Sequence, residues 1–378
     1  MKFLFIVQGE GRGHLTQALA LEEMLKHNGH EVVGVMVGKS SSRSLPSFFT
    51  EKIDTPIKVF ASPNFKATRT NKRFSLLWSI LFNLVRLPLY IKSMFTIRRN
   101  ISSAKPDMVV NFYEALTGLT YATLFPSRPY ICIGHQYMFL HPDFRFPPRK
   151  SKIQLAALRW YTRLTCLRAK RKLALSFYPM SEVQSRKLVV VPPLLRKEIG
   201  MLKPQNGEYI NGYLLNSGFA NEVKKYHKEQ PGQPLRFFWD KRGCEKETRI
   251  DDTLTFYQID DSMFLHSLAG CKAYATTAGF ESICEALYLG KPVMMVPAHV
   301  EQDCNAFDAV RAGAGIVCKE FDIDRLLMFT KSYYPHKDFI DWASSAEYHI
   351  IRHIEKVGTA INRKRIILPK SVSSEPSF

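Results

Sequence analysis

The chain has 378 residues, of which 46% are hydrophobic and 23% charged, and its formal net charge is +19 at pH 7. At roughly 150 residues per domain, this length predicts two globular domains. The seven cysteines are odd in number and show no C-x-x-C spacing, which excludes a disulfide-rich secreted scaffold and favours reduced thiols in a cytoplasmic protein.

The N-terminal segment predicts a strand–helix–strand unit. Phe3–Val7 is a continuous apolar run, which is typical of a parallel strand buried on both faces. A Gly-rich turn at 8–13 leads into a helix through Lys26, and a strand follows over Glu31–Val37. The glycines do not match the G-x-G-x-x-G fingerprint and no acid closes the second strand, so a nicotinamide-dinucleotide site is disfavoured.

Alternating strands and helices continue along the chain. For the rest of the first half we expect a helical region at 74–101, a strand at 107–111, a helix at 114–124, a strand at 130–133, a loop at 134–150, a helix at 153–172, and strands at 175–178 and 188–191. Pro192-Pro193 breaks this pattern and is the predicted linker. For the second half we expect strands at 209–215, 236–239, 253–258, 273–276 and 292–296, helices from 279 and 301, and a final helix at 342–357.

This alternation predicts an α/β protein with two Rossmann-like doubly wound parallel-sheet domains facing a cleft. The predicted divisions are 1–193, 194–341, a C-terminal helix at 342–365 and a tail at 366–378. The tail is rich in Ser and Pro, and we expect it to be disordered.

The most informative stretch lies between residues 273 and 305. A strand ends in a small-residue turn at Gly279, where a helix begins, and a helix N-terminus of this kind suits a phosphate. The polar positions are Thr277-x-Gly279-x-x-Ser282-x-x-Glu285, then Gly290-x-Pro292, then Glu301-Gln302-x-x-Asn305-Ala306. Their order and spacing resemble the donor-binding signature of GT-B glycosyltransferases. In particular they resemble the branch containing the lipid-linked N-acetylglucosaminyltransferase of peptidoglycan synthesis and the UDP-glycosyltransferases.

The resemblance implies that 194–341 binds a nucleotide sugar, that 1–193 binds the acceptor, and that the helix at 342–365 returns to the first domain. It implies ribose binding by Glu285, donor-sugar contacts by Glu301 and Gln302, and diphosphate binding at the Gly turn. The other donor-binding residues predicted on this basis are Gly11, Gly13, Ser217, Gly218, Thr277, Gly279, Phe280, Ser282 and Asn305. Two positions depart from the pattern: many relatives carry His at the position of Thr277 and Asn at that of Glu281.

Two residues are candidates for the catalytic base. His14 follows the first Gly-rich turn, and imidazole titrates near neutrality. Glu114, after a predicted strand, is an alternative base or orients His14. The competing interpretations are a histidine that stabilises a helix start and an acid favoured by a helix N-terminus. Direct displacement would invert the anomeric centre. No cofactor or metal site is predicted, because Asp322-x-Asp324 lies in a helical region and His135 and His141 have no partnering Cys.

Positive charge is concentrated in two parts of the first half. No acid occurs between Asp54 and Asp107, and 145–197 contains fourteen Lys and Arg against one acid, Glu182. The run Phe74–Phe95 is apolar but interrupted by polar and basic residues, so it is a poor membrane span. It predicts helices lying on an anionic lipid surface, with Trp78, Leu81 and Phe82 as apolar contacts. The alternative is a long buried helix with a solvated basic edge.

The prediction is therefore an inverting, metal-independent glycosyltransferase that acts on a lipid-linked or other hydroxyl acceptor, in cell-envelope glycan synthesis. We expect it in the cytoplasm or peripherally on the inner face of the membrane. His135 is expected either near the acceptor or as an ordinary loop residue. No nucleic-acid motif accompanies the basic clusters. The rival functions are a UDP-N-acetylglucosamine 2-epimerase-type enzyme on the same fold and a non-catalytic nucleotide-sugar-binding protein at the membrane.

Overall fold

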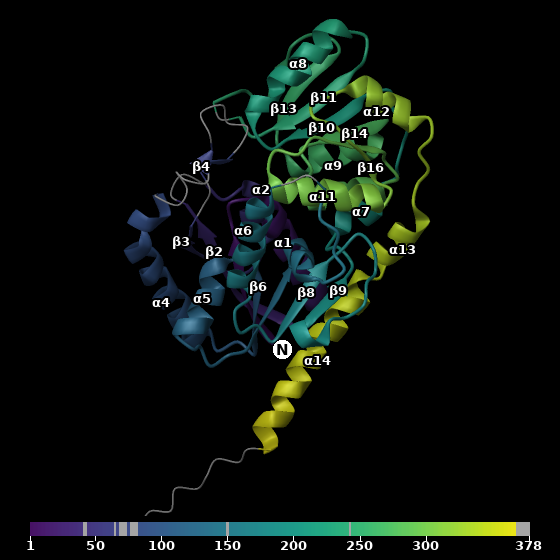
Figure 1. Cartoon of the computed structure of the whole chain (residues 1–378). Coiled ribbons are helices and arrows are strands. Elements are labelled where there is room, and N and C mark those ends of the chain that lie inside the picture. The colour runs from purple at the N-terminus through teal and green to yellow at the C-terminus, as the bar shows by residue number, and fades with distance from the viewer. Residues whose placement is uncertain are drawn as a thin grey trace, which may run out of the picture.

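Two seven-stranded sheets, each flanked by helices, lie one above the other in the computed structural model of the chain (Figure 1). The structure describes residues 1–40, 44–63, 66–67, 74–75, 82–148, 151–241 and 243–367. Side chains are described in the same ranges except at 66–67, 74–75 and 361–367. The prediction of two doubly wound parallel-sheet domains is confirmed.

The first sheet is parallel throughout and has the strand order β3-β2-β1-β6-β7-β8-β9. Its strands are β1 (Lys2–Gln8), β2 (Glu31–Lys39), β3 (Ile57–Ala61), β6 (Met108–Phe112), β7 (Tyr130–Gly134), β8 (Arg171–Leu175) and β9 (Leu188–Val191). The direction of strand addition reverses between β1 and β6. The carboxyl ends of these two strands are therefore where a ligand site is expected.

Burial on both faces explains the apolar run in β1. Phe3, Phe5 and Val7 belong to one buried cluster, while Leu4 and Ile6 belong to a second cluster on the opposite face. The helices and 3-10 segments of this half are α1 (Arg12–His27), α2 (Ser47–Lys52), α4 (Leu87–Ala104), α5 (Ala115–Thr123), η1 (His135–Leu140), α6 (Lys152–Thr165) and η2 (Gln184–Arg186). Helix α1 packs in the first cluster and α4 in the second. A short hairpin, β4 (Lys66–Ala67) and β5 (Phe74–Ser75), is separate from the sheet.

The second sheet has the order β12-β13-β11-β10-β14-β15-β16, and only β12 pairs antiparallel. Its strands are β10 (Ile210–Leu214), β11 (Leu235–Trp239), β12 (Glu247–Arg249), β13 (Leu254–Gln258), β14 (Ala273–Thr276), β15 (Val293–Met295) and β16 (Gly315–Val317). Its helices and 3-10 segment are α7 (Lys197–Met201), η3 (Ser217–Phe219), α8 (Ala220–Glu229), α9 (Asp261–Gly270), α10 (Phe280–Tyr288), α11 (Val300–Arg311) and α12 (Ile323–Thr330).

The chain crosses between the two halves twice. It passes from β9 to β10, and it returns through α13 (Lys337–Ser344) to α14 (Ala346–Ile367), which runs alongside the first sheet (Figure 1). The Trp342 indole donates to the Ser176 carbonyl over 3.0 Å, and Asn28 donates to Glu347 over 2.7 Å. The predicted single helix at 342–357 is thus divided at Ser345. Helix α14 extends to Ile367, and the rest of the predicted disordered tail lies outside the described residues.

Two predicted boundaries are wrong. The helix expected at 153–172 ends at Thr165, and Arg168 has a positive φ of 64° that is incompatible with a continuing helix. The following residues form β8, earlier than the strand expected at 175–178. In the segment expected as helical at 74–101, Phe74–Ser75 is a strand, residues 82–85 are helical, and α4 begins at Leu87, where Pro88 suits the first turn of a helix.

Candidate active site

The first loop brings backbone close to backbone at the end of β1. Gly9 donates to the Gly38 carbonyl over 2.7 Å, and a Cβ at Gly9 would lie 2.6 Å from the Val37 side chain. Helix α1 then begins after Gly11, which supplies no side-chain cap. A Cβ at Gly13 would overlap the carboxylate of Glu281. Gly13 therefore permits a close approach between the two halves.

His14 lies in the first turn of α1 and is 8% exposed. Its Nδ1 is 3.2 Å from Gln17 Oε1, and its Nε2 is 3.4 Å from Gln136 Nε2. The Tyr113 ring lies beside it, 5.5 Å between centroids. Burial lowers the pKa of His14 to about 4, so the imidazole is neutral at physiological pH and keeps one nitrogen lone pair.

Glu114 lies elsewhere. It caps α5, where its carboxylate accepts from the Leu116 backbone N–H over 3.0 Å and from the Ser62 hydroxyl over 2.8 and 2.9 Å. A Cβ at Gly38 would overlap this carboxylate, so Glu114 faces β2 and β3. Burial raises its pKa to about 7. The structure therefore brings Glu114 together with Ser62, whereas the hydrogen-bond partners of His14 are glutamines.

The Gly turn of the donor motif begins α10. Ala278 has a positive φ of 65°, and Gly279 precedes the helix without a side-chain cap. The Thr277 hydroxyl accepts from the Leu215 backbone N–H over 3.1 Å, which ties this turn to the loop at 216–218 containing Ser217 and Gly218. Ser282 donates back to the Gly279 carbonyl over 3.2 Å. The two predicted diphosphate-binding turns are thus adjacent.

Glu285, the predicted ribose ligand, is 2% exposed and paired with Arg196. The Nε of Arg196 donates to Glu285 Oε1 over 2.7 Å and its Nη2 lies 2.6 Å from the same oxygen, while its Nη1 donates to Asp261. Lys52 of α2 also bonds Asp261, over 3.0 Å. The sequence pattern did not predict this pairing, because Arg196 lies just after the linker and far from the motif.

Helix α11 carries the remaining predicted donor contacts. Glu301 Oε1 accepts from Gln136 Nε2 over 2.9 Å, and Gln302 Oε1 accepts from the Ala298 backbone N–H over 2.9 Å. Asn305 donates to the Ala278 carbonyl over 3.3 Å, while its buried Oδ1 has no hydrogen-bond partner among the described residues. Asn305 therefore stabilises the Gly turn through this hydrogen bond.

Three side chains that sequence reasoning had not assigned to the site join these elements. Gln17 is fully buried, and its Nε2 donates to Glu281 Oε1 across the two halves. Glu281 is half-buried, and burial raises its pKa to about 7. The available signal was the i, i+3 spacing of His14 and Gln17, which places both on one face of a helix. Gln136, the third of these residues, falls within the loop predicted at 134–150.

The predicted acceptor residues are placed differently. His135 is 1% exposed and stacks on Phe280, 3.9 Å between centroids, with its Nδ1 2.8 Å from the Leu175 carbonyl. It therefore packs between the halves. Phe82 is half-buried, with the Arg86 guanidinium 4.1 Å from its ring centroid. Trp78 and Leu81 lie outside the described residues. Within the described part of the chain, no group of three His, Cys, Asp or Glu residues could hold a metal ion.

Solved structures with the same architecture are glycosyltransferases. The glycosyltransferase of kitacinnamycin has a TM-score of 0.60 at 16% identity, covering 97% of this chain and 99% of that one. UGT2 of Phytolacca americana, complexed with UDP-2-fluoro-glucose and pterostilbene, has a TM-score of 0.62 at 11% identity, covering 95% and 98%. UGT89C1 of Arabidopsis thaliana, complexed with UDP-L-rhamnose, has a TM-score of 0.58 at 15% identity, covering 94% and 98%.

The sequence itself assigns the chain to a family. No curated protein sequence gives a significant match. The family model described as glycosyl transferase family 1 matches residues 1–333, which is most of the chain. Both halves of the site, the turn before α1 and the motif around α10 and α11, lie within that match. The protein is therefore a glycosyltransferase and belongs to glycosyl transferase family 1.

Proposed function

We propose that the enzyme moves a sugar from a UDP-sugar to an acceptor hydroxyl with inversion of the anomeric centre, and that His14 is the catalytic base. The observation that carries this proposal is the position of His14. Its neutral ring lies in the first turn of α1 and is joined, through Gln17 and Gln136, to the helices α10 and α11 that begin with the donor motif. Two neighbouring structures contain UDP-sugars, which supports the choice of donor.

In the proposed reaction, His14 Nε2 takes the proton of the acceptor hydroxyl as its oxygen attacks the anomeric carbon. The bond from that carbon to the diphosphate breaks, and its electron pair leaves on the phosphate oxygen. The uncapped N-terminus of α10 and the turn at Ser217 and Gly218 would stabilise this charge without a metal. A diphosphate beside His14 would also raise the low pKa of the imidazole, because a nearby negative charge favours the protonated form.

The donor would occupy the second half, residues 194–341, and the acceptor the first, residues 1–193, with the segment 342–365 returning to the first half. Glu285 would bind the ribose by exchanging one of its bonds to Arg196 for the ribose hydroxyls. Glu301 and Gln302 would contact the sugar from the start of α11. On the acceptor side, a cavity of about 200 Å³ lies beside Ser62, Lys39 and Arg86. The Ser62 hydroxyl in its lining donates a hydrogen bond to Glu114.

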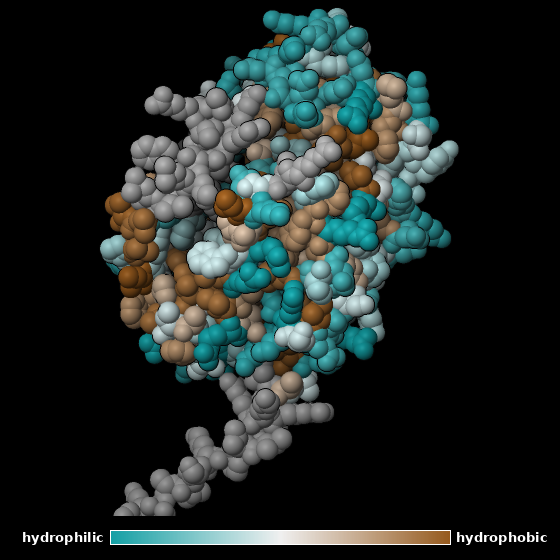
Figure 2. Space-filling model, in the orientation of Figure 1, coloured by the Kyte–Doolittle hydropathy of each residue, from teal (hydrophilic) through white to brown (hydrophobic). Residues whose placement is uncertain are grey.

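We place the acceptor at an anionic membrane surface. The described part of the chain contains no helix long and apolar enough to cross a membrane. Helix α4, however, exposes Leu87, Ile91 and Phe95 by 50%, 53% and 53%, and Figure 2 shows an apolar surface over this helix. The same helix carries Lys92, Arg98 and Arg99. This combination suits a lipid-linked saccharide as acceptor in envelope glycan synthesis.

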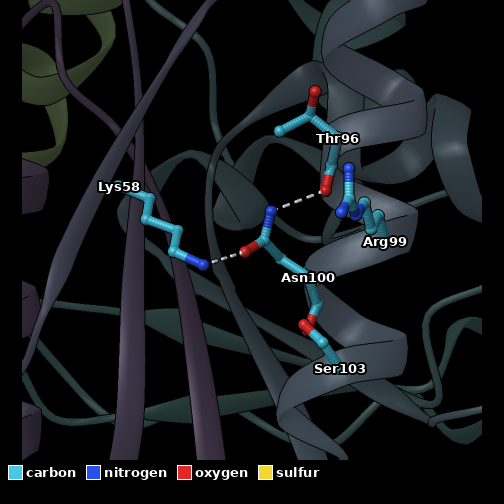
Figure 3. A pocket seen from close by; sticks show the side chains of 5 residues that line it. All are labelled: Lys58, Thr96, Arg99, Asn100 and Ser103. Atoms are coloured by element: carbon cyan, nitrogen blue, oxygen red, sulfur yellow. Dashed lines mark hydrogen bonds between the residues drawn. The ribbon is translucent and has the colours of Figure 1, made fainter.

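A basic groove continues this surface. Lys58 of β3 and Arg99 of α4 line a cavity of about 360 Å³ together with Thr96, Asn100 and Ser103 (Figure 3). The Lys58 ammonium donates to Asn100 Oδ1 over 2.7 Å. Its lining offers hydroxyl and cationic donors next to the apolar face of α4. Such donors match the phosphates of a lipid headgroup.

The test is a panel of radiolabelled UDP-sugars incubated with the protein, with and without a membrane lipid extract. Transfer of label to a lipid-extract component supports the proposal. His14→Ala should then lower kcat about 10²–10⁴-fold, because a general base contributes on this order, while UDP affinity stays within about twofold. Epimerisation without transfer, or binding without turnover by the wild-type protein, would each replace the proposal with the corresponding rival. Wild-type activity in His14→Ala would assign the base elsewhere.

A further inference from the structure

His14 is held between two glutamines, and each glutamine reaches an acid of the second half. On one side Gln17 Oε1 meets His14 Nδ1 at 3.2 Å, and Gln17 Nε2 donates to Glu281. On the other side Gln136 Nε2 lies 3.4 Å from His14 Nε2 and 2.9 Å from Glu301 Oε1. The resulting chain of side chains runs from α10 through His14 to α11.

The chemistry of these groups fixes the direction of each hydrogen bond along this row of side chains. An ionised carboxylate only accepts hydrogen bonds, and the amide N–H₂ of Gln17 donates to Glu281. The carbonyl of Gln17 then faces His14 Nδ1, which must carry the proton in order to donate to it. On the opposite side Gln136 presents its N–H₂ group to both Glu301 and His14, and this requires a lone pair on His14 Nε2. The two sides therefore favour the same tautomer, and both are needed to hold it.

We infer that Glu281, acting through Gln17, is a positioning residue that fixes His14 in the tautomer protonated on Nδ1. This keeps the lone pair on Nε2, where the acceptor hydroxyl would replace the Gln136 amide. This inference rests on the proposed role of His14 as base. It assigns a function to the position at which many relatives carry Asn. Glu114 does not perform this function, because its carboxylate is bonded to Ser62 and the Leu116 backbone.

Because Glu281 belongs to α10 and Gln17 to α1, the tautomer depends on the two halves being together. The bare Cα of Gly13 permits this arrangement, since a Cβ there would overlap the Glu281 carboxylate. The base is thus complete only when the helix that begins with the donor motif is docked against α1. This links donor-side geometry to the state of the catalytic nitrogen.

The test uses the full-length protein labelled with ¹⁵N-histidine, with the His14 signals assigned by their loss in His14→Gln. Wild-type protein should show His14 protonated on Nδ1 alone above pH 7. Glu281→Gln, whose amide no longer dictates the orientation of Gln17, and Gln17→Leu, which removes the bridge, should both give mixed tautomers. Both should lower kcat roughly 10- to 100-fold, with UDP affinity within about twofold. Glu281→Asp should recover part of the lost kcat.

The matched control is Glu320→Gln, which makes the same change at an exposed acid of the second half and should alter neither readout. Wild-type His14 protonated on Nε2, or an unchanged tautomer and kcat in Glu281→Gln, would overturn the inference even if the enzyme transfers sugar. The expected tautomers in a protein that consumes no UDP-sugar would instead overturn the proposed function. The nuclear magnetic resonance measurement needs no activity, so the two failures are separable.

Discussion

Two acids in this enzyme, the buried Glu114 and the half-buried Glu281, have pKa values raised to about 7, and their neighbours explain how each is tolerated. Within the described part of the chain, Glu114 accepts from neutral donors, the Ser62 hydroxyl and the Leu116 N–H. Glu281 receives the amide of Gln17. Neither group has a cation among the causes that shift its pKa, so desolvation dominates and favours the protonated form. Folding stability should therefore depend on the protonation of both residues.

The pH dependence follows for Glu114, which is fully buried. Its pKa rises from 4.5 to about 7 on folding, so its contribution to stability is full below pH 4.5 and is lost as pH rises to about 7. This loss amounts to roughly 3 kcal/mol at most, taking about 1.4 kcal/mol for each pH unit. The Glu114→Gln variant should not lose stability in this way, because an amide does not ionise. Its stability relative to wild type should increase between pH 5 and 7.5.

Urea denaturation at a series of pH values measures this difference, with Glu320→Gln as the exposed control. Parallel stability curves for wild type and Glu114→Gln would show that the carboxyl stays charged throughout the range. The result bears on catalysis as well, because a residue that is protonated near pH 7 is a poor candidate for a fixed anion beside a base.

At this scale the sequence motif predicted a set of residue types but not their contacts. Thr277 and Gly279 lie in one strand–helix connection, and Asn305 of α11 donates to the Ala278 carbonyl within it. The pairing of Glu285 with Arg196 and that of Glu281 with Gln17 join residues 89 and 264 positions apart. The first of these contacts depends on the folding of the second half and the second on how the two halves dock, and local sequence patterns encode neither.

Among the elements, α4 shows most clearly how a fold leaves an apolar face uncovered. Its buried residues Tyr90, Ile97 and Ile101 pack under the first sheet, while Leu87, Ile91 and Phe95 point outward. The sequence predicted a helix here from its apolar and basic composition. It could not distinguish the buried stripe from the exposed one, since both stripes are apolar.

We expect α4 to bind anionic bilayers by charge and by insertion. The protein should sediment with phosphatidylglycerol vesicles at ~0.1 M salt and be partly released at 1 M, where the Debye length falls to ~3 Å. Little should bind phosphatidylcholine vesicles. Replacing Leu87, Ile91 and Phe95 with Ser should remove the salt-resistant fraction without lowering Tm, because all three are exposed.

Met328→Ser is the control for this experiment, since Met328 is an exposed apolar residue of the second half, at 70% exposure. Equal binding by the triple variant and wild type would exclude α4 as the inserted element. A collapse of Tm in the triple variant would show that its side chains are part of the core.

Other elements show why strand and helix assignments differed in accuracy. β1 and β6 were predicted correctly because their residues are buried on both faces and form uninterrupted apolar runs. The junction of α6 and β8 was misjudged, because basic and apolar residues alternate through 163–175 in a way that fits either period. Pairing with β7 and β9 decides in favour of the strand there.

For the molecule as a whole, one ion network lies where the first crossing meets both halves. Lys52 of the first half bonds Asp261 and Glu198, and Arg196 bonds Asp261 and Glu285. Its members differ in exposure: the Arg196 side chain is 9% exposed and that of Lys52 40%. The Arg196 ion pairs should therefore contribute more to the free energy of unfolding than those of Lys52, because solvent screens the more exposed Lys52 pairs.

Arg196→Gln should therefore reduce the free energy of unfolding by about 3–5 kcal/mol, since it leaves Glu285 buried without its cation. Lys52→Gln, the matched change at the outer end, should cost about 1 kcal/mol or less. Guanidinium denaturation at one pH compares the two variants directly. Similar small losses in both would mean that Glu285 finds another partner or a proton when Arg196 is removed.

The two crossings of the chain, at 192–209 and again through α13 into α14, have a consequence for motion. Because the two halves are joined at two separate points, translation and twisting of one half against the other are restricted. The motion that remains is mainly a rotation about the line through the two connections. Opening and closing of this enzyme should thus follow a single angular coordinate. Along that coordinate the Gln17–Glu281 and Gln136–Glu301 hydrogen bonds would break together on opening and form together on closing.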